Sequence, residues 1–369
     1  MSKKPVVYLG LSGGVDSAVA AVLLMRRGYN VKGVFLKIWS DKMDDAAACP
    51  WVQDRLDAMA VAAKLGIPLV TLDFEKQYKE QVFSYFVQEY KAGRTPNPDI
   101  LCNEVIKFGV FLDYALSHGA DYIATGHHAR RIPEEGSEAE TTYRLLAGID
   151  EQKDQSYFLS RLNQHQLRHT LFPIGNLTKT EVRRLAELED LDVVAQKRST
   201  RGICFIGKVD LKEFLSKYTI EQPGEIIDLN GMVVGAHKGV SFYTIGQRKG
   251  LDIPASSSKA KPAYIVAKDA VKNQLIVAQD NEGALKSDEL YCRDLHWLDG
   301  KIRALPLTCQ ARIRYHQTLQ EVTISIGSKD QRDPGIVYAK FAAPQRAITP
   351  GQFIVFYQGE EVLCSAVID

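Results

Sequence analysis

One stretch near the N-terminus has the residue types that bind phosphate groups: Gly10-Leu11-Ser12-Gly13-Gly14-Val15-Asp16-Ser17. Two adjacent glycines let backbone N–H groups approach an anion without a Cβ in the way. A helix that begins here would add unpaired N–H groups and the positive end of its dipole. The Asp16 carboxylate is compatible with phosphates if Mg²⁺ lies between them. No Gly-Lys-Ser/Thr follows, so this is not a Walker A loop. An ordinary strand-to-helix turn is the alternative.

Two of the six cysteines have surroundings that favour a reactive thiol. Cys102 follows the rigid stretch 95–99, and we expect it in the first turn of a helix, where the dipole favours the thiolate. Asp99 precedes it by three residues and would accept or return a proton. Cys204 lies among positive charges, which lower a thiol pKa. These charges are Lys197, Arg198, Arg201 and Lys208.

The alternative for both thiols is a buried structural cysteine, the common state of a free Cys. We expect that state for the other four: Cys49, Cys292, Cys309 and Cys364. No CxxC pair occurs, so the spacing indicates neither a zinc site nor a disulfide framework, and no resident metal is predicted. An iron–sulfur cluster held by Cys102, Cys204 and a third thiol stays open.

The elements that must position these groups alternate in the first half of the chain. Apolar runs predict strands at 6–11, 31–35, 68–72 and 122–125. Helical spacing predicts helices at 17–27, 54–65, 76–91 and 102–117, the first three ended by Gly28, Gly66 and Gly93. The prolines of 94–99 exclude that loop from a helix. Such alternation predicts a mostly parallel sheet whose ligands bind at the carboxyl ends of the strands.

Beyond about residue 220 the pattern changes to short alternating runs with turn signals, such as the hairpin turn at 228–231. We therefore predict an α/β fold class. A Rossmann-like domain with a parallel sheet spans 1–210, a small β-rich central domain 211–282, and a C-terminal β-barrel 283–369.

Composition narrows the class of protein. The 369 residues carry 46 Lys and Arg against 45 Asp and Glu, so a net charge of +1 gives no long-range attraction to nucleic acid. No apolar run is long enough to span a membrane or to act as a secretory signal, so we expect a cytoplasmic protein with reduced thiols. Residues 301–320 and 335–359 contain Lys and Arg but no acid, which favours local binding of phosphates. A solvated barrel surface is the alternative.

The strand, the Ser-Gly-Gly-x-Asp-Ser loop and the amphipathic helix together resemble the PP-loop ATP pyrophosphatase superfamily. With both cysteine motifs, the chain resembles the bacterial tRNA-specific 2-thiouridylase family over nearly its whole length. The matching segments are 10–17, 95–103, 124–127, 153–158, 202–207, 243–250, 314–315 and 349–352. It departs from the family pattern at 198–201, at His128 and at 252–258.

This resemblance implies an ATP-dependent tRNA-uridine 2-sulfurtransferase. ATP, with Mg²⁺, would adenylate the C2 oxygen of the wobble uridine. Cys204 would carry a persulfide received from a sulfur-donor protein and deliver sulfur to C2, giving 2-thiouridine, AMP and pyrophosphate. Cys102 would attack the persulfide and leave a transient disulfide, or sulfide would be released and attack instead. Asp99 would act as acid and base. A monomer without membrane contact is expected.

The same resemblance assigns binding residues. ATP would contact Gly10, Leu11, Ser12, Gly13, Gly14, Val15, Asp16, Ser17, Leu36 and Gly126. The target base would be lined by Asn97, Pro98 and Asp99. Other parts of the tRNA would contact His127, Lys153, Asp154, Gln155, Arg314, Tyr315 and Gln352.

Two other classes of protein compete with this hypothesis. A PP-loop ligase or amidotransferase acting on a small metabolite explains the loop but gives no role to Cys102 or Cys204. Lysidine-type tRNA ligation also needs no paired cysteines. A non-catalytic RNA-binding or sulfur-carrier protein with a degenerate nucleotide site is disfavoured by the intact Ser12, Asp16 and Ser17. Conversion of ATP to AMP that depends on tRNA would separate the three.

Overall fold

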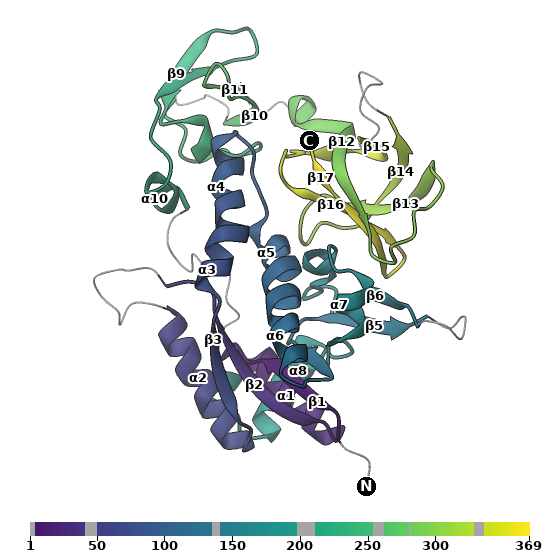
Figure 1. The fold of residues 1–369 in the computed structure, drawn as a ribbon. Coiled ribbons are helices and arrows are strands. Elements are labelled where there is room, and N and C mark those ends of the chain that lie inside the picture. The colour runs from purple at the N-terminus through teal and green to yellow at the C-terminus, as the bar shows by residue number, and fades with distance from the viewer. Residues whose placement is uncertain are drawn as a thin grey trace.

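The computed structural model describes residues 4–40, 50–134, 141–197, 211–253, 262–279, 282–327 and 336–369. A parallel α/β domain, a small β domain and a β-barrel follow one another along the chain (Figure 1). This confirms the predicted fold class. Among these residues, no helix is long and apolar enough to cross a membrane.

The N-terminal domain is built on a five-stranded parallel sheet of order β3-β2-β1-β4-β7. Its strands are β1 (Val6–Gly10), β2 (Asn30–Lys37), β3 (Leu69–Asp73), β4 (Tyr122–Ala124) and β7 (Thr170–Leu171). Alternate residues of β1 enter two different cores: Val6 and Tyr8 pack on one face, Val7 and Leu9 on the other. Because both faces are covered, the strand is a continuous apolar run, as parallel sheets require.

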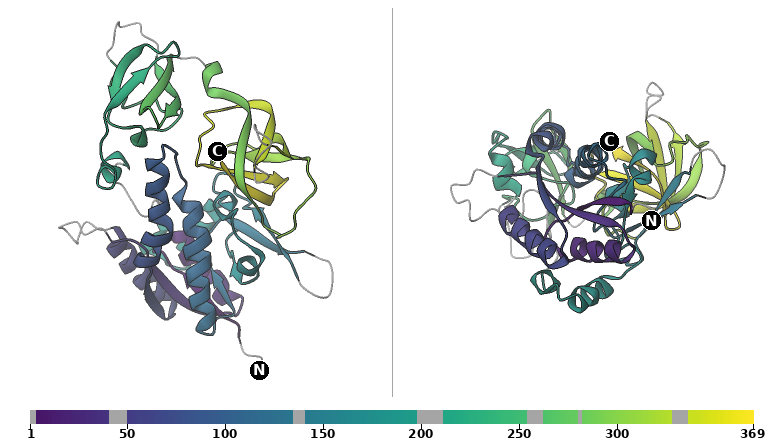
Figure 2. Two further views of the ribbon diagram at one scale, coloured as in Figure 1. Left: turned by 45° about the horizontal axis from the view of Figure 1, so that its top comes forward. Right: turned by 60° about the horizontal axis from the view of Figure 1, so that its bottom comes forward.

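Helices cover both faces of this sheet (Figure 2). One face packs against α1 (Val15–Arg26), α2 (Pro50–Leu65), α8 (Lys179–Leu188) and α9 (Asp192–Ala195). The other packs against α3 (Glu75–Tyr78), η2 (Lys79–Phe83), α4 (Ser84–Lys91), α5 (Pro98–Leu101), η3 (Cys102–Val110) and α6 (Phe111–Ser117). The short helices η4 (Ser156–Leu159) and α7 (Gln164–Arg168) precede β7.

The helix that carries Cys102 begins earlier than predicted. Pro98 is its first residue, and the Asn97 side chain caps it by accepting a hydrogen bond from the Ile100 N–H. Proline is favourable at this position because its missing N–H would have no partner inside the helix. The prediction that both prolines of 94–99 lie outside the helix was therefore wrong for Pro98.

The central domain is a four-stranded sheet of order β10-β11-β8-β9. Its elements are α10 (Leu211–Ser216), β8 (Gly224–Ile227), β9 (Val233–His237), η5 (Val240–Phe242), β10 (Ala263–Asp269) and β11 (Gln274–Gln279). The hairpin turn predicted at 228–231 joins β8 to β9, and Gly231 supplies its positive φ of 81°. Asp228 closes the turn by accepting the N–H groups of Asn230 and Met232.

In the barrel, β12 pairs with both β15 and β17, which closes a ring of six strands within the described chain. After η6 (Glu282–Leu285), the strands are β12 (Lys286–Trp297), β13 (Leu307–Arg312), β14 (Gln320–Ile326), β15 (Val337–Arg346), β16 (Phe353–Gln358) and β17 (Glu361–Ile368). A hairpin of β5 (Ala129–Pro133) and β6 (Tyr143–Ala147) extends this sheet through β17, although it belongs to the N-terminal half of the chain. The β5–β6 hairpin of the N-terminal half is thus joined to the C-terminal barrel by backbone pairing.

Candidate active site

The phosphate-binding loop connects β1 to α1, as the sequence predicts. Leu11 and Val15 are buried and fix the loop to the core by their side chains. The Ser17 hydroxyl accepts the Ser12 N–H at 3.2 Å and donates to the Gly14 carbonyl at 3.0 Å, so it shapes the loop from inside. Ser12 is exposed. A ligand therefore meets backbone groups and the Ser12 side chain.

Gly126 follows β4 and completes a cradle beside this loop. β1 lies between β2 and β4, so the connections leave in opposite directions at this point, which is where open parallel sheets bind ligands. A Cβ on Gly126 would lie 2.7 Å from the Asp16 carbonyl carbon and from the Ser17 nitrogen, so only glycine allows this approach. Leu36, near the end of β2, is half-buried. The structure thus brings Gly126 to the start of α1, as ATP binding at the loop would require.

Asp16 is held by two residues that sequence reasoning missed. The Lys179 ammonium donates to both Asp16 carboxylate oxygens at 2.6 Å, and the His128 Nε2 lies 3.2 Å from Oδ1. Burial alone would raise the pKa of Asp16, but the His128 hydrogen bond and the Lys179 charge outweigh it and hold the pKa below its ordinary value. His128 is buried, and its Nδ1 has no hydrogen-bond partner among the described residues. The carboxylate is therefore ionised and fixed.

A local signal for Lys179 exists in the sequence. Thr178 and Glu181 form a capping box at the start of α8, which makes Lys179 the first helical residue. The Lys179 N–H donates to the Asp150 carboxylate at 2.8 Å, which fixes this helix end. The motif predicts where α8 begins, but it does not reveal that this end lies against Asp16.

The described residues do not fit a magnesium site held by the protein alone. They contain no group of three or more His, Cys, Asp or Glu side chains arranged to hold a metal ion. Asp16, the carboxylate expected to face Mg²⁺, already carries the Lys179 ammonium. The ATP cradle is a better fit, because a Cβ on Gly14 would meet only the Ser12 side chain and Ser12 is exposed.

Cys102 differs from the expectation of an activated thiol. It is the fifth residue of the continuous helix that starts at Pro98, so it lies beyond the first turn. It is only 1% exposed, and burial raises the pKa of its thiol to about 11, an effect that Lys107 opposes and Asp99 adds to. The helix dipole fades within one turn, whereas desolvation acts on the whole group. The predicted lowering of this pKa was therefore wrong.

Around Cys102 the structure joins two of the predicted tRNA-contacting segments. Asn103 is buried; its amide donates to the Phe158 carbonyl at 3.0 Å, and its Oδ1 has no partner among the described residues. The Phe158 ring packs on Tyr315 of the barrel with centroids 4.5 Å apart. Asn97, Pro98 and Asp99 begin the same helix. Cys102 and the candidate base-lining residues thus belong to the same helix and its N-cap.

The segment 153–155 is connected to the nucleotide loop through His128, which contacts Asp16. Gln155 accepts the His128 N–H and returns its own N–H to the His128 carbonyl. The Asp154 carboxylate is buried and occupied by Gly148, Ser156 and Arg312. Lys153 is half-buried. The Asp154 side chain is therefore used by contacts within the protein. Contact of this segment with tRNA stays a prediction.

His127 lies between two aromatic rings. Its centroid is 5.7 Å from that of Phe108 and 6.4 Å from that of Phe172, and its Nδ1 is 2.7 Å from the Thr125 hydroxyl. Burial, with the charges of Lys107 and His128, lowers the pKa of His127 well below its ordinary value. This histidine is neutral near pH 7 and would meet RNA by packing or hydrogen bonding.

The loop before Asn97 is held by the two other domains. Gln352 of the barrel donates to the carbonyls of Thr95 and Pro96 at 2.7 and 3.2 Å, and the Thr95 N–H donates to Pro350. The Thr95 hydroxyl lies 3.3 Å from that of Thr244 in the central domain. The predicted tRNA contact of Gln352 thus coincides with a contact inside the protein.

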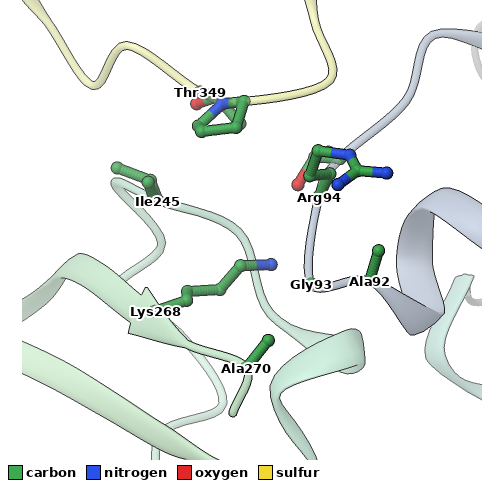
Figure 3. Close-up of a pocket in the computed structure, with 9 residues that line it drawn as sticks. Ala92, Gly93, Arg94, Ile245, Lys268, Ala270 and Thr349 are labelled. Carbon is green, nitrogen blue, oxygen red and sulfur yellow. The ribbon is translucent and has the colours of Figure 1, made fainter. Parts of the chain in front are cut away.

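A cavity of about 140 Å³ lies at this three-domain junction. Figure 3 shows the Lys268 side chain pointing into it, opposite Thr349 and beside the 92–95 stretch. The Lys268 ammonium donates to the carbonyls of Tyr243 and Val240, and burial lowers its pKa to about 8. The junction is therefore polar rather than a dry apolar contact.

The acid-free stretches of the barrel do not form the uniformly basic faces that the sequence indicates. Arg303 pairs with Asp299, Arg312 with Asp154, and Lys340 with Asp288. In the described chain, Arg314 and Arg346 have no acidic partner, and Arg314 donates to the Arg346 carbonyl. Asp154 and Asp288 reach the barrel cations by tertiary contacts, and Asp299 lies four residues before Arg303, so the candidate phosphate-binding surface is smaller than predicted.

The remaining cysteines divide by position. Cys292, Cys309 and Cys364 are buried in the barrel core, which confirms the expected structural thiols. Burial raises the pKa of Cys292 and of Cys309 to about 12. Cys49 and Cys204 lie outside the described residues. The approach of Cys204 to Cys102, which a transient disulfide requires, therefore stays a prediction.

Comparison with known families covers almost the entire chain. Residues 5–208 match the tRNA methyl transferase HUP domain, 212–279 the tRNA methyl transferase PRC-barrel domain, and 287–368 the aminomethyltransferase beta-barrel domain. Among solved structures, NMN synthetase from Francisella tularensis is 19% identical with a TM-score of 0.32, and the match covers 56% of this chain and 71% of that chain. A likeness this slight carries no functional argument.

The sequence relatives are much closer. The tRNA-specific 2-thiouridylase MnmA 1 of Geobacillus kaustophilus is 49% identical over 368 residues, 100% of this chain and 96% of its own. The tRNA-specific 2-thiouridylase MnmA of Shouchella clausii is 45% identical over 364 residues, 98% of this chain and 96% of its own. With three domain matches in order and near-complete coverage of both chains, this chain belongs to the tRNA-specific 2-thiouridylase family.

Proposed function

We propose that this chain is an ATP-dependent tRNA 2-thiouridylase that replaces the C2 oxygen of the wobble uridine with sulfur. The observation that carries the proposal is the ionised Asp16, fixed by Lys179 and His128 at the mouth of the glycine loop, in a chain with full-length 2-thiouridylase relatives. A fixed polar cluster beside an open backbone cradle suits phosphoryl chemistry. The two competing classes of protein do not explain the family match.

In the first half-reaction, the uracil O2 attacks the α-phosphorus of ATP and pyrophosphate leaves. A uracil carbonyl is a poor electrophile, and an adenylated oxygen leaves readily as AMP. Ser12, Gly13 and Gly14 would bind the phosphates, and Gly126 would lie near the adenosine. Mg²⁺ is expected to arrive with ATP, whose charge it neutralises. Lys179, which pairs with Asp16 beside the loop, would stabilise negative charge at the phosphates on leaving Asp16.

In the second half-reaction, the terminal sulfur of a Cys204 persulfide attacks C2 and AMP leaves. Attack by Cys102 on the Cys204 sulfur then frees the thiocarbonyl and leaves a disulfide, which a thiol must reduce. In the alternative, Cys102 attacks the inner sulfur of the Cys204 persulfide first, so that the disulfide forms and hydrosulfide leaves; the hydrosulfide then attacks C2 and AMP leaves. Because the free chain buries Cys102 as a protonated thiol, the disulfide route needs a rearrangement on RNA binding, with Asp99 as the proton acceptor.

The partners follow from this chemistry. The tRNA supplies an anticodon loop from which a base is extruded at low cost. Arg314 and Arg346, which have no acidic partner among the described residues, are the barrel cations that would bind its phosphates. A persulfide-carrying donor protein would load Cys204. We propose a monomer, since one chain contains both the loop and the two thiols.

The test is nucleoside mass spectrometry of unmodified tRNA incubated with the protein, ATP, Mg²⁺ and a persulfide donor. We expect sulfur in place of oxygen at the wobble uridine, and loss of the product in Cys204→Ser. AMP formation without a thiolated base would keep an adenylating enzyme and move its substrate elsewhere. No AMP at all would leave a binding protein.

A further inference from the structure

One lysine outside the proposed reaction contacts the nucleotide loop directly. The Lys197 ammonium donates to the Gly13 carbonyl at 3.1 Å, to Asp54 at 2.7 Å and to Asp57 at 2.6 Å. Both acids belong to α2. Burial would lower the pKa of Lys197, but the hydrogen bonds to Asp54 and Asp57 outweigh it and raise the pKa. The lysine therefore stays charged and joins α2 to the loop.

The Gly13 carbonyl is part of a peptide that two glycines leave free to turn over. Reversal of the Gly13–Gly14 peptide changes ψ of Gly13 and φ of Gly14 by about half a turn, and glycine reaches positive φ at little cost. In the structure Gly13 has φ of +74° and Gly14 has φ of −106°. The isolated loop can thus adopt either orientation of the Gly13–Gly14 peptide. A contact from outside the loop is needed to stabilise one of them.

The choice determines which group faces the phosphates. In a trans peptide the C=O and the following N–H point in opposite directions. With the Gly13 oxygen turned to Lys197 and α2, the Gly14 N–H points to the other side, where it has no hydrogen-bond partner among the described residues. A reversed peptide would present a carbonyl oxygen to an anion.

The loop is also seated closely on α2. A Cβ on Gly13 would lie 2.1 Å from the Asp54 carbonyl oxygen, so the Gly13 Cα rests on the helix backbone. The acids Asp54 and Asp57 thus hold the ammonium at the one place from which it reaches the Gly13 oxygen. Gln53 donates to the other Asp57 oxygen at 2.7 Å and fixes that carboxylate.

We propose that Lys197 is a positioning residue for ATP, which locks the Gly13–Gly14 peptide with its N–H toward the phosphates. The inference rests on the proposed function, in which this loop binds ATP. Lys197 touches no reacting atom and acts through the peptide. Its loss should weaken ATP binding by the worth of a charge-assisted hydrogen bond, roughly tenfold to a hundredfold.

The experiment is calorimetric binding of Mg²⁺ and α,β-methylene-ATP to the full chain without tRNA, with AMP release on tRNA as the second readout. We expect Lys197→Met to raise Kd and the ATP KM by that factor with a small change in kcat, and Lys197→Arg to recover most of the loss. Lys64→Met is the matched control, since Lys64 belongs to α2, the helix that Lys197 contacts, and pairs with the exposed Asp190. It should bind like the parent chain.

A triple variant separates orientation from simple neutralisation. Lys197→Met combined with Asp54→Asn and Asp57→Asn removes the unpaired charges that destabilise the single variant, so its Tm should recover while nucleotide binding stays weak. Recovery of binding in the triple variant would overturn the proposal, because charge balance alone would then explain Lys197. Absence of nucleotide binding by the parent chain would instead contradict the proposed function.

Discussion

The nucleotide loop and the Cys102 helix are two candidate chemical sites prepared in opposite ways. At the loop, residues far apart in sequence hold the local groups in place: Lys179 and His128 fix Asp16, and Lys197 fixes Gly13. At the helix, the thiol is sealed in the apolar core and its pKa is raised to about 11. The free protein is thus organised for the ATP step, whereas the sulfur step depends on what RNA binding changes.

The largest effect is expected at Cys102, because no other side chain replaces its thiol as the nucleophile. Cys102→Ser should lower 2-thiouridine formation on the order of 10³-fold or more, because a hydroxyl is a far weaker nucleophile toward sulfur. AMP release should persist. Nucleoside mass spectrometry and an AMP assay on the same reaction measure both steps. Cys309→Ser, a buried barrel thiol, is the control, and an equal loss there would remove the distinction between the two cysteines.

Removal of the Asp16 carboxylate should impair the ATP step, whereas Cys102→Ser should impair only the sulfur step. Asp16→Ala frees Lys179 and His128 from their partner, and we expect AMP release to fall roughly 10²–10³-fold, the range for lost electrostatic preorganisation. Release of pyrophosphate measures it. Asp288→Ala removes a barrel acid paired with Lys340 and should leave the rate unchanged. A normal rate in Asp16→Ala would mean that the cluster only supports the fold.

The pH dependence of thiol alkylation tests the sealed state of Cys102. Because burial raises its pKa to about 11, we expect alkylation to accelerate about tenfold per pH unit from pH 7 to 10 and to level off above pH 11. In guanidinium the midpoint should return to about 8.5. Peptide mass spectrometry isolates this cysteine. A midpoint below pH 8 in the folded chain would show that the free protein already lowers the pKa of Cys102. A lower midpoint in the presence of tRNA would show that RNA binding activates the thiol.

A smaller effect is expected at Gly126. The Cβ of Gly126→Ala would lie 2.7 Å from the backbone of Asp16 and Ser17, so α1 must move. We expect an ATP KM raised about tenfold and a loss of about 1–3 kcal/mol in unfolding free energy, as for other overpacking substitutions. Steady-state kinetics and urea unfolding measure the two quantities. An unchanged KM would mean that ATP binding does not depend on the close approach of Gly126 to α1.

The smallest effect concerns the link between the two sites. Gln352→Ala removes the donors to Thr95 and Pro96, which should cost about 1 kcal/mol of stability. We expect a several-fold lower kcat with tRNA and an unchanged ATP KM, because the loop leads to the Cys102 helix and not to the nucleotide. Gln358→Ala, at the exposed last position of β16, the strand that follows Gln352, is the control. A raised ATP KM would show that the barrel acts on the nucleotide loop instead.

The sequence alone predicts the elements whose signals are local. Alternating apolar runs, glycine helix ends and the 228–231 turn all depend on neighbours within a few residues, so four strands of the parallel sheet and most of its helices could be placed. The fifth strand, β7, is only two residues long and was missed. The glycine loop could be placed too, because its function resides in consecutive backbone groups. The start of the Cys102 helix was missed because proline disfavours most helical positions but suits the first.

Tertiary structure alone decided the charge state and partners of the candidate residues. The distance from Asp16 to Lys179 spans 163 residues of sequence, and that from Lys197 to Gly13 spans 184, so no window of sequence contains either pair. The same applies to Asp154 and Asp288, which pair with the barrel cations Arg312 and Lys340, and to the burial that keeps Cys102 protonated. Residue type sets what a side chain can do, whereas desolvation and distant partners set what it does, because both depend on how the chain packs.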